Sequence, residues 1–393
     1  MNILMITDVY FPRINGVSTS IATFRRALAD LGHHSCLIAP DYYREQETSV
    51  DIIRVPSRYL FLDPEDRVLQ AAKILALEKQ LGKQRFDLVH IQTPFIAHHT
   101  GLTLARRLGL PVVETYHTYF EEYLFHYVPF LPRSLLRALA RDFTRRQCNQ
   151  LDAVIVPSRA MQKVLTAYDV QVPVSIIPTG IDPDEFAPGS KQRFCEVHDI
   201  DSRRPLLVHI GRLAHEKNIG FLLEVLSAVR TQVPQVLLVI AGEGPALESL
   251  RKQATRLGLN DNLLFAGYLQ RGVDLWDCFC CGDAFVFSSA TETQGLVLLE
   301  AMTLGVPVVS TAVMGTIDIL QAGRGALVAE PSVTDFTAKV LRLLQDPVLR
   351  LKLGKEGRQY AQEWSALRMA ERLADFYVNR INQYKPEGLL SRA

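Results

Sequence analysis

Two carboxylates stand eight positions apart in the segment TETQGLVLLEA, residues 291–301, at Glu292 and Glu300. Glycoside hydrolases use such a pair as acid and base on either side of one bond. Eight helical residues rise roughly 12 Å, which is too far for one proton-transfer site unless Glu292 lies outside the helix. The glutamates could instead bind one long ligand with many hydroxyls, or they could be a helix N-terminus and an unrelated surface charge.

The start of the same segment is a candidate for ligand contacts through the backbone. Thr291, Glu292 and Thr293 stand where a helix cap is expected, and Gly295 would let the chain approach a ligand closely. Successive amides there could face an oxyanion or sugar hydroxyls. Glu292 is then expected in the loop and Glu300 in the second helical turn.

Two cations form a second candidate group, in the segment IGRLAHEKNIG. Gly211 and Arg212 follow an apolar run, and Lys217 stands just ahead of an apolar-periodic helix. A helix N-terminus attracts anions, and two cations five residues apart suit a diphosphate held at two points. Solvated loop charges are the alternative interpretation.

The segment IAGEGPAL carries Gly242 and Gly244 between an apolar run and a helical pattern, with Pro245 expected in the first helical turn. It lacks the third glycine of the dinucleotide-binding fingerprint. Either the backbone approaches a flat or phosphorylated ligand here, or the segment is an ordinary tight turn. After the next apolar run, Tyr268 and Leu269 could offer a nucleobase an aromatic or aliphatic face.

These segments follow short apolar runs that alternate with longer helical patterns, as in a parallel sheet covered by helices on both faces. In the first half we expect strands at residues 3–6, 35–39, 52–55, 87–91, 111–115, 153–157 and 174–178. In the second half we expect them at residues 205–210, 235–242, 262–267, 284–289, 307–311 and 326–330. The sequence therefore predicts two doubly wound α/β units, with the candidate residues at the carboxyl ends of the strands, where such folds bind ligands.

The joint between the two units is predicted at residues 179–190, TGIDPDEFAPGS, where proline and glycine are frequent. We expect an N-terminal domain at residues 1–180 and a C-terminal domain at residues 181–364. The remainder, residues 365–393, predicts an amphipathic helix that crosses back to the N-terminal domain. Two such domains imply a deep cleft between them.

The composition narrows the class of protein. The 393 residues include 43 basic and 42 acidic side chains, so no global positive field favours nucleic acid as a partner. The six cysteines have no regular spacing, and no apolar run approaches the roughly 18 residues of a membrane span. We therefore expect a cytoplasmic protein, unless it rests on a membrane surface. The Asp-x-Asp triplets at 182–184 and 199–201 are interpreted as turns and not as metal ligands.

The segment FLPRSLLRALARDFTRRQ predicts a basic amphipathic helix. Arginine recurs at every fourth residue, at Arg133, Arg137, Arg141 and Arg145. A second face carries the apolar residues Leu135, Leu136, Leu139 and Phe143. Such helices lie on anionic bilayers, which attract each basic residue by about 1 kcal/mol. The alternative is a helix packed on the sheet, with its arginines in water.

Together the segments GRLAHEK, AGEGP and TETQGLVLLEAMTLGVPVV resemble the retaining sugar-nucleotide glycosyltransferases of family 4, whose GT-B fold has two facing Rossmann-like domains. The likeness covers nearly the whole chain, and it implies that the domain at residues 1–180 binds the acceptor and that the domain at residues 181–364 binds the nucleotide-sugar donor. It implies that Arg212 and Lys217 hold the donor diphosphate, that Glu300 binds the ribose hydroxyls and that Glu292 contacts the transferred sugar. Gly16 matches the family's N-terminal glycine loop. The predicted donor-binding set is Gly16, Gly211, Arg212, Lys217, Gly244, Tyr268, Leu269, Glu292, Thr293, Gln294, Gly295, Leu296 and Glu300.

A narrower likeness lies in ETYHTYFEEYLFHY, residues 114–127, which resembles diacylglycerol glucosyltransferases and related lipid glycosyltransferases of the family. His117 occupies the family's position for a histidine near the reacting sugar, although a core histidine is the alternative. The resemblance implies a front-face displacement in which the leaving diphosphate helps to deprotonate the acceptor. His117, Arg212, Lys217 and Glu292 are the predicted catalytic residues, and neither a metal nor another cofactor is expected.

The predicted function is transfer of a hexose, from UDP-glucose, to a membrane lipid such as diacylglycerol, by a peripheral protein on the cytoplasmic face of the inner membrane. A glucosyl- or mannosyltransferase that acts on a polysaccharide or lipopolysaccharide precursor, or on a soluble acceptor, is the rival within the same enzyme class. Three functions of different classes compete with both: a glycoside hydrolase, a pyridoxal-phosphate phosphorylase and a sugar-nucleotide sensor without turnover. The sequence leaves open UDP against GDP, the acceptor and the oligomeric state.

Overall fold

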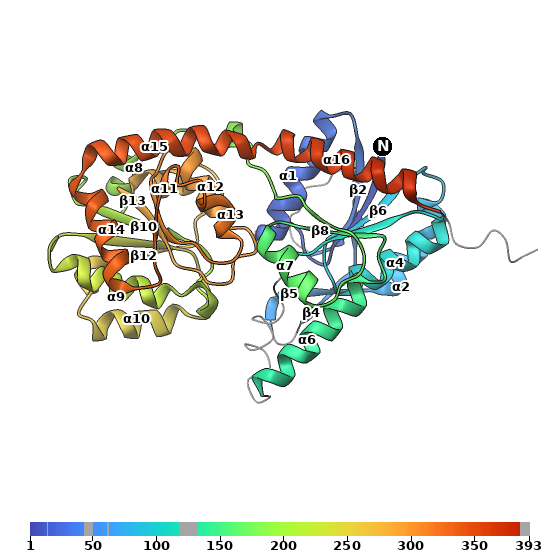
Figure 1. Cartoon of the computed structure of the whole chain (residues 1–393), viewed down its shortest axis with the longest axis horizontal. Helices are drawn as coiled ribbons and strands as arrows, with labels where there is room; N and C mark the ends of the chain where they lie inside the picture. The colour runs from blue at the N-terminus through green and yellow to red at the C-terminus, as the bar shows by residue number, and fades with distance from the viewer. Residues whose placement is uncertain (14, 43–49, 61–62, 118, 120–131, 386–393) are drawn as a thin grey trace, which may run out of the picture. The chain divides into compact units, whose positions relative to one another are not determined.

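The structure is a computed structural model that describes the chain except residues 14, 43–49, 61–62, 118, 120–131 and 386–393. The chain divides into two compact units, shown in Figure 1. Unit 1 comprises Met1–Gly180 with Ala366–Ala393, and unit 2 comprises Ile181–Ser365. The boundary after Gly180 lies within the segment rich in proline and glycine.

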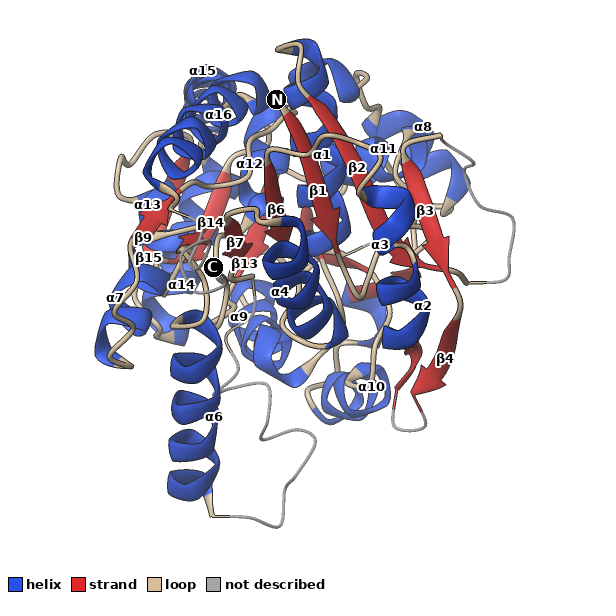
Figure 2. Cartoon of the chain, turned by 90° about the vertical axis from the view of Figure 1, so that its right-hand side faces the viewer, coloured by secondary structure: helices blue, strands red, loops and turns tan. Residues whose placement is uncertain are grey.

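Unit 1 contains a seven-stranded parallel sheet in the order β3-β2-β1-β6-β7-β8-β9. Its strands are β1 (Asn2–Ile6), β2 (His34–Pro40), β3 (Ile52–Val55), β6 (Leu88–Ile91), β7 (Val112–Thr115), β8 (Ala153–Val156) and β9 (Val174–Ile176). All seven predicted strands are present. The strand order reverses between β1 and β6, so a topological switch point lies between these two strands, which Figure 2 shows side by side.

Helices cover both faces of this sheet. They are α1 (Gly16–Asp30), α2 (Ala71–Ala76), α3 (Glu78–Leu81), α4 (Ile96–Leu108), α6 (Arg133–Cys148), α7 (Arg159–Ala167) and α16 (Ala366–Gln383). Helix α16, from the far end of the chain, packs beside α1 on unit 1. Its Tyr377 is fully buried, and the Tyr377 hydroxyl lies 2.6 Å from Nδ1 of His90.

A two-stranded antiparallel hairpin, β4 (Ser57–Leu60) and β5 (Asp63–Leu69), was not predicted. Strand β5 reads DPEDRVL, and proline and acidic residues are uncommon in strands. Its Arg67 is buried and donates from Nη2 to the Tyr42 carbonyl oxygen at 3.2 Å. Tertiary contacts, and not local pattern, therefore support the hairpin.

Unit 2 contains a six-stranded parallel sheet in the order β12-β11-β10-β13-β14-β15. Its strands are β10 (Leu206–Ile210), β11 (Leu237–Ala241), β12 (Leu263–Gly267), β13 (Ala284–Phe287), β14 (Val308–Thr311) and β15 (Ala326–Ala329). All six were predicted. The order reverses between β10 and β13, so the loops after these two strands flank the switch point of the sheet. Both units are thus the predicted doubly wound α/β layers.

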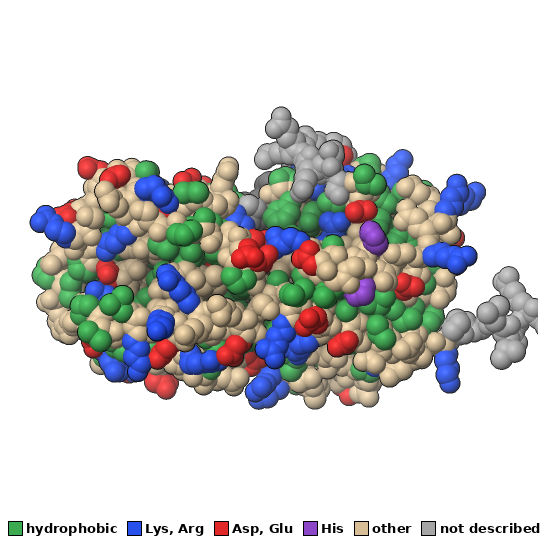
Figure 3. Space-filling view, turned by 90° about the horizontal axis from the view of Figure 1, so that it is seen from above, with side chains coloured by type: hydrophobic (Ala, Val, Ile, Leu, Met, Phe, Trp, Pro, Cys, Tyr) green, Lys and Arg blue, Asp and Glu red, His purple; other side chains and the backbone are tan. Residues whose placement is uncertain are grey.

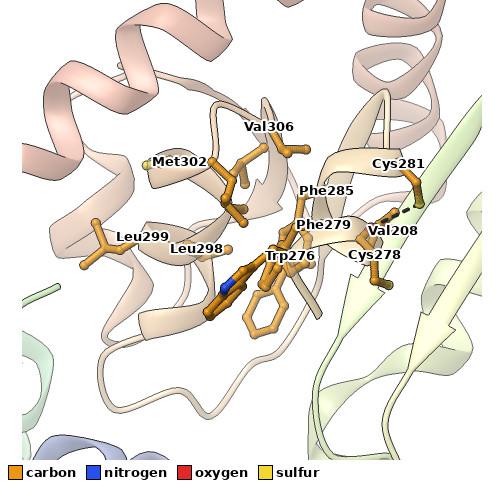
Figure 4. Packing of buried hydrophobic residues seen from close by; sticks show 14 of the residues in the cluster. Val208, Trp276, Cys278, Phe279, Cys281, Phe285, Leu298, Leu299, Met302 and Val306 are labelled. Atoms are coloured by element: carbon orange, nitrogen blue, oxygen red, sulfur yellow. Dashed lines mark hydrogen bonds between the residues drawn. The ribbon is translucent and has the colours of Figure 1, made fainter. Parts of the chain in front are cut away.

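The helices of unit 2 enclose an apolar core on each face of the sheet. They are α8 (Lys191–Val197), α9 (Ile219–Arg230), α10 (Leu247–Arg256), α11 (Val273–Cys281), α12 (Leu296–Thr303), α13 (Thr316–Leu320), α14 (Val333–Gln345) and α15 (Pro347–Ala361). Figure 4 shows Trp276 and Phe279 of α11 beside Phe285 of β13. Burying one such large apolar side chain stabilises the fold by about 1.5–3 kcal/mol.

The surface and the cysteines agree with the balanced composition. Basic and acidic side chains are interspersed on the face shown in Figure 3. All six cysteines are free thiols. Among the described helices, none is both long and apolar enough to cross a bilayer.

Candidate functional site

The loops that follow β10 and β13 are joined to each other at the switch point of unit 2. Asn218 donates from Nδ2 to the Ser288 carbonyl oxygen at 3.4 Å, and the Ser288 hydroxyl donates to the Asn218 carbonyl oxygen at 3.0 Å. The Ser289 hydroxyl donates to the Glu216 carbonyl oxygen at 3.5 Å. These bonds fix residues 215–218 against residues 288–292.

Lys217 and Glu292, two predicted site residues, form an ion pair across this junction between Nζ and Oε1. Their side chains are 23% and 16% exposed, so the pair is partly shielded from water but still accessible. The sequence placed these residues in one site without pairing them. An anionic ligand at this edge would compete with Glu292 for the Lys217 ammonium group.

A buried histidine lies beneath the pair. His209 of β10 donates from Nδ1 to the Val286 carbonyl oxygen at 3.0 Å. Burial lowers the pKa of His209 to about 4, so this imidazole is neutral at pH 7. His209 therefore adds no charge to the ion pair of Lys217 and Glu292 at pH 7.

Arg212 and the start of α9 complete the cationic side of the site. Arg212 is exposed on the loop after β10, five residues before Lys217. Helix α9 begins after Asn218, which has a left-handed backbone at φ 55° and makes no side-chain capping bond. The N-terminus of α9 thus combines a positive dipole end with two nearby cations, which favours an anion.

The glycines of the 242–244 segment are explained by packing between loops. A Cβ atom at Gly242 would lie 2.0 Å from the Gly211 carbonyl oxygen, and one at Gly244 would lie 2.4 Å from the Leu213 carbonyl oxygen. Leu213 N also donates to the Glu243 carbonyl oxygen at 2.8 Å. Of the two sequence interpretations, the tight turn therefore accounts for both glycines, and a ligand contact by Gly244 stays a prediction. Helix α10 begins at Leu247, so Pro245 precedes the helix and the expectation for it was wrong.

Helix α12 begins later than the sequence suggested. Its first residue is Leu296, and its N-cap is Gly295 at φ 94°, without a side-chain cap. Thr291 and Thr293 therefore lie in the loop, and the expectation that residues 291–293 form the cap was wrong. A Cβ atom at Gly295 would lie 2.9 Å from Cγ2 of Thr316, so both backbone and space require glycine here.

The loop after β14 supports the same segment from the other side. Gly315 N donates to the Glu292 carbonyl oxygen at 2.8 Å, and a Cβ atom at Gly315 would lie 2.0 Å from the Thr293 carbonyl oxygen. Gln294 is buried, while Leu296 is partly exposed at the helix start. The backbone from Thr293 to Leu296 is therefore held at the open end of α12.

Glu300 lies in the second turn of α12, as predicted, but its partner was missed. Arg271 donates from Nη1 to Glu300 Oε1 at 2.9 Å and from Nη2 to Glu185 Oε2 at 3.1 Å. Arg271 follows β12, so it belongs to the same sheet edge as Lys217 and Glu292. As a single arginine in a polar turn, it had no sequence signal beyond its position after a strand.

The two residues proposed for a nucleobase differ in exposure. Tyr268 is 50% exposed directly after β12, so its ring is accessible from solvent. Leu269 is packed against the core of unit 2. Tyr268 is thus the residue of the two that can offer a flat face.

In unit 1, His117 lies just after β7, as predicted. Its Nε2 donates to Gln92 Oε1 at 3.3 Å, and Gln92 follows β6. Burial lowers the pKa of His117 to about 4, so the imidazole is neutral at pH 7. A neutral imidazole can exchange hydrogen bonds with hydroxyls, and sequence reasoning missed its partner Gln92.

Asp8 follows β1 at the switch point of unit 1 and was also missed. It accepts hydrogen bonds from the Thr93 hydroxyl at 2.7 Å and from Ala97 N at 3.1 Å. Burial raises the pKa of Asp8 to about 6, although these bonds oppose the shift. Because Ala97 lies in the first turn of α4, a structural role as a cap explains Asp8.

Gly16 is the first residue of α1, and Asn15 caps the helix by accepting from Ser18 N at 2.8 Å. A Cβ atom at Gly16 would meet no atom within 4 Å. Gly16 therefore lies at a helix start and not inside a loop, and its predicted contact with the donor stays a prediction.

Helix α6 has three faces and not the two that were predicted. Leu136 is buried against unit 1, whereas an apolar row remains exposed. The apolar row consists of Leu135 (46% exposed), Leu139 (53%) and Phe143 (41%). Placing Leu136 on the same face as these residues was wrong, because one residue of displacement turns a helix by about 100°. Figure 2 shows α6 extending away from the sheet of unit 1.

The arginines of α6 are not all directed into water. Arg141 lies over the Tyr168 ring at 5.6 Å, and Arg145 donates to Asp142 Oδ1 at 2.8 Å. Arg137 is exposed, and the side chain of Arg133 lies outside the described residues. Of the arginines in the predicted row, Arg141 and Arg145 thus make intramolecular contacts as well as facing solvent.

The described residues contain no group of three or more histidine, cysteine or acidic side chains placed to hold a metal ion. The two Asp-x-Asp triplets behave as the predicted turns. Asp182 accepts from Asp184 N at 3.0 Å, and Asp201 accepts from Arg203 N at 2.9 Å.

Two family models match the chain. Residues 14–185 match the model described as Glycosyltransferase Family 4, and residues 190–360 match the model described as Glycosyl transferases group 1. The two matches fall on the two units, with the site of Lys217, Glu292 and Glu300 in the second.

Similar proteins agree with these matches. The chain is 34% identical to the alpha-monoglucosyldiacylglycerol synthase of Streptococcus pneumoniae over 322 residues, covering 79% of this chain and 71% of the relative. It is 28% identical to a GDP-mannose-dependent alpha-mannosyltransferase of Mycobacterium tuberculosis, covering 83% of each chain. Among solved structures, the sucrose-phosphate synthase of Thermosynechococcus elongatus superimposes with a TM-score of 0.78 at 20% identity, covering 98% of this chain and 100% of that one.

Proposed function

Because this chain belongs to glycosyltransferase family 4 and has the GT-B fold, we propose that it transfers glucose from UDP-glucose to a diacylglycerol lipid at a membrane surface. The glucosyl and diacylglycerol parts of the proposal rest on the name of the relative from Streptococcus pneumoniae. The observation that carries the donor role is that two ion pairs, Lys217 with Glu292 and Arg271 with Glu300, and two open helix ends lie at the carboxyl edge of one sheet.

The cationic side of this edge suits the donor diphosphate. Arg212, Lys217 and the uncapped start of α9 would hold the phosphates. As the sugar leaves, negative charge grows on the diphosphate, and these fixed groups stabilise it. Lys217 would pass from Glu292 to the phosphate and leave the Glu292 carboxylate for the hydroxyls of the sugar.

The remaining contacts follow along one extended donor. The backbone of Thr293 to Leu296 faces the sugar phosphate, Glu300 accepts from the ribose hydroxyls, and Tyr268 covers the base. His117, a neutral imidazole, serves as a hydrogen-bonding partner of the transferred sugar and not as an obligate base. The reaction retains the anomeric configuration through a front-face displacement, and it needs no metal ion.

Helix α6 supplies the proposed membrane contact. Its apolar row presents three large side chains to solvent, and exposed Arg137 and Arg145 lie on the same helix. Apolar side chains enter the interface of a bilayer while arginines attract anionic lipid headgroups. The enzyme would then act as a peripheral protein and meet its lipid acceptor at the surface.

A second candidate is transfer of mannose from GDP-mannose. The relative from Mycobacterium tuberculosis, which is named for this donor, favours it. The two donors differ in the base and in the configuration of one sugar hydroxyl, so the proposed diphosphate and ribose contacts serve both.

The proposal is tested by a panel of donors and acceptors. UDP-glucose, UDP-galactose and GDP-mannose are each offered with diacylglycerol in vesicles or with soluble sugars, and nucleotide release and glycosylated product are measured. We expect α-linked glucosyl-diacylglycerol from UDP-glucose, unaffected by EDTA. Mannosyl product from GDP-mannose would establish the second candidate, and donor binding without product would indicate a sensor.

A further inference from the structure

Arg271 bridges two carboxylates at the carboxyl edge of the sheet in unit 2, which is called the donor edge below because the donor is proposed to bind there. Its guanidinium group donates from Nη1 to Glu300 at 2.9 Å and from Nη2 to Glu185 at 3.1 Å. Glu185 belongs to the short 3-10 helix Pro183–Glu185, close to the boundary at Gly180. Arg271 thus connects the start of unit 2 with the second turn of α12.

Aromatic rings pack against the Arg271 guanidinium group and hold it in place. The Arg271 guanidinium carbon lies 5.5 Å from the centroid of the Phe186 ring and 5.3 Å from that of Trp276. These two rings contact each other with centroids 4.5 Å apart, and Trp276 is part of the buried core in Figure 4. Because the Arg271 side chain is only 27% exposed, it has little freedom to move.

The contact with Arg271 uses one carboxylate oxygen of Glu300 and leaves the other, Oε2, available to a ligand. Arg271 contacts Oε1, and Oε2 accepts no hydrogen bond from any other described residue. The Glu300 side chain is 13% exposed, so a misdirected or unpaired carboxylate would be costly at this position. A vicinal diol that donates to a carboxylate needs it ionised and correctly turned.

We propose that Arg271 is the positioning residue for nucleotide recognition: it orients the Glu300 carboxylate toward the ribose diol and is itself held by Glu185. This inference rests on the proposed function of Glu300 as the ribose ligand. Arg271 touches no donor atom in this scheme, so its loss reduces donor affinity without changing the chemical step. The affinity that is lost is the part that depends on the ribose hydroxyls.

The unit also offers a matched control. Arg324 pairs with Glu363 at 2.8 and 2.7 Å and lies 4.2 Å from the centroid of the Tyr360 ring. It precedes β15, so it lies at the amino-terminal edge of the same sheet, opposite the donor edge. Arg324→Gln removes a similar ion pair and ring contact without approaching the site.

The experiment compares binding of UDP and 2′,3′-dideoxy-UDP to the full chain by calorimetry. The wild type should bind UDP at least about tenfold more tightly, since hydrogen bonds to a charged group are worth that much. In Arg271→Gln, UDP should weaken about tenfold while dideoxy-UDP changes less than twofold. The KM for the donor should rise with kcat unchanged, and Arg324→Gln should match the wild type.

Each other result decides the matter. If Arg271→Gln keeps the wild-type preference for UDP, the positioning role is wrong. If it does not fold, Arg271→Lys and Glu185→Gln replace it, and an unchanged preference in both overturns the inference. If the wild type binds the two nucleotides equally, Glu300 does not bind the ribose, and the proposed donor contacts fail together with this inference. If the protein binds GDP and not UDP, the comparison uses GDP and 2′,3′-dideoxy-GDP.

Discussion

Replacing Lys217 by methionine tests the proposed diphosphate site, because it removes one cation and exposes the charge of its partner. A charge-assisted hydrogen bond to phosphate contributes about 1.5–3 kcal/mol, or roughly 10- to 150-fold in Kd. Glu292 would then face the diphosphate without a counter-ion. At about 5 Å and an effective dielectric constant of about 20, that repulsion reaches about 3 kcal/mol. We expect the affinity for UDP to fall at least about 30-fold.

A second substitution, at Glu292, distinguishes loss of the diphosphate contact from general damage to the protein by the direction in which it changes the affinity for UDP. In the wild type, Glu292→Gln should leave UDP binding within about threefold, because Lys217 remains. On the Lys217→Met background, the same change should tighten UDP binding about tenfold, because it removes the unpaired carboxylate. Titration calorimetry with UDP alone measures all four proteins without involving the sugar.

Lys191 provides the control for Lys217. It pairs with Asp283 at 3.3 Å with side chains 30% and 20% exposed, so its burial is comparable, but Asp283 precedes β13 at the amino-terminal edge of the sheet. Both lysine variants should lose no more than about 1 kcal/mol of stability, since the pairs are partly exposed. Unchanged UDP affinity in Lys217→Met, or an equal loss in Lys191→Met, would refute the diphosphate role.

Gly295→Ala should weaken UDP binding at least fivefold and lower stability by about 1–3 kcal/mol, because the backbone has φ 94° and Thr316 blocks the new methyl group. Gly32→Ala is the control for backbone strain alone, because Gly32 has φ 78° and a Cβ atom there would meet no atom within 4 Å. Changing the apolar row of α6 to serine should abolish binding to anionic vesicles in flotation assays, while serine at the exposed Val348 and Leu351 of α15 should leave it intact. Burial lowers the pKa of three fully buried histidines, His90 to about 3 and both His117 and His209 to about 4, so stability should fall as the pH decreases from about 6.5 to 4. The raised pKa of Asp8, about 6, acts in the opposite direction and offsets only part of this fall. A melting temperature that stays constant over that range would contradict this prediction.

The sheets were predictable because each central strand is a nearly continuous apolar run, which only a sheet covered on both faces can bury. The observed ends of the strands differ from the predicted ends by up to two residues, because a strand ends where its hydrogen bonds to the neighbouring strand end and not where the apolar run ends. The hairpin of β4 and β5 was missed because its support comes from residues distant in sequence, such as the contact of Arg67 with Tyr42. The faces of α6 were misjudged because the pattern does not reveal which apolar residue meets the core.

In the site, the sequence predicted which residues follow strands but not which of them meet. That information lies in the order of the strands. Lys217 follows β10 and Glu292 follows β13, and they pair because the sheet places these two strands side by side at its switch point. Likewise His117 meets Gln92 because β6 and β7 are neighbours. The glycines of 242–244 show the same limit, since a need for close approach does not say whether a ligand or another loop approaches.

Strand order also resolves the two glutamates that stand eight positions apart. Each has its own cation from a different loop: Lys217, after β10, pairs with Glu292, and Arg271, after β12, pairs with Glu300. An acid and base that act on one bond must have different proton affinities and lie on either side of it, whereas these carboxylates are each neutralised separately. Two separately neutralised carboxylates along one edge are suited to different parts of a single extended ligand. Because the two cations differ, the sites can be tested independently: Lys217→Met should affect the response to phosphate, and Arg271→Gln the response to the ribose hydroxyls.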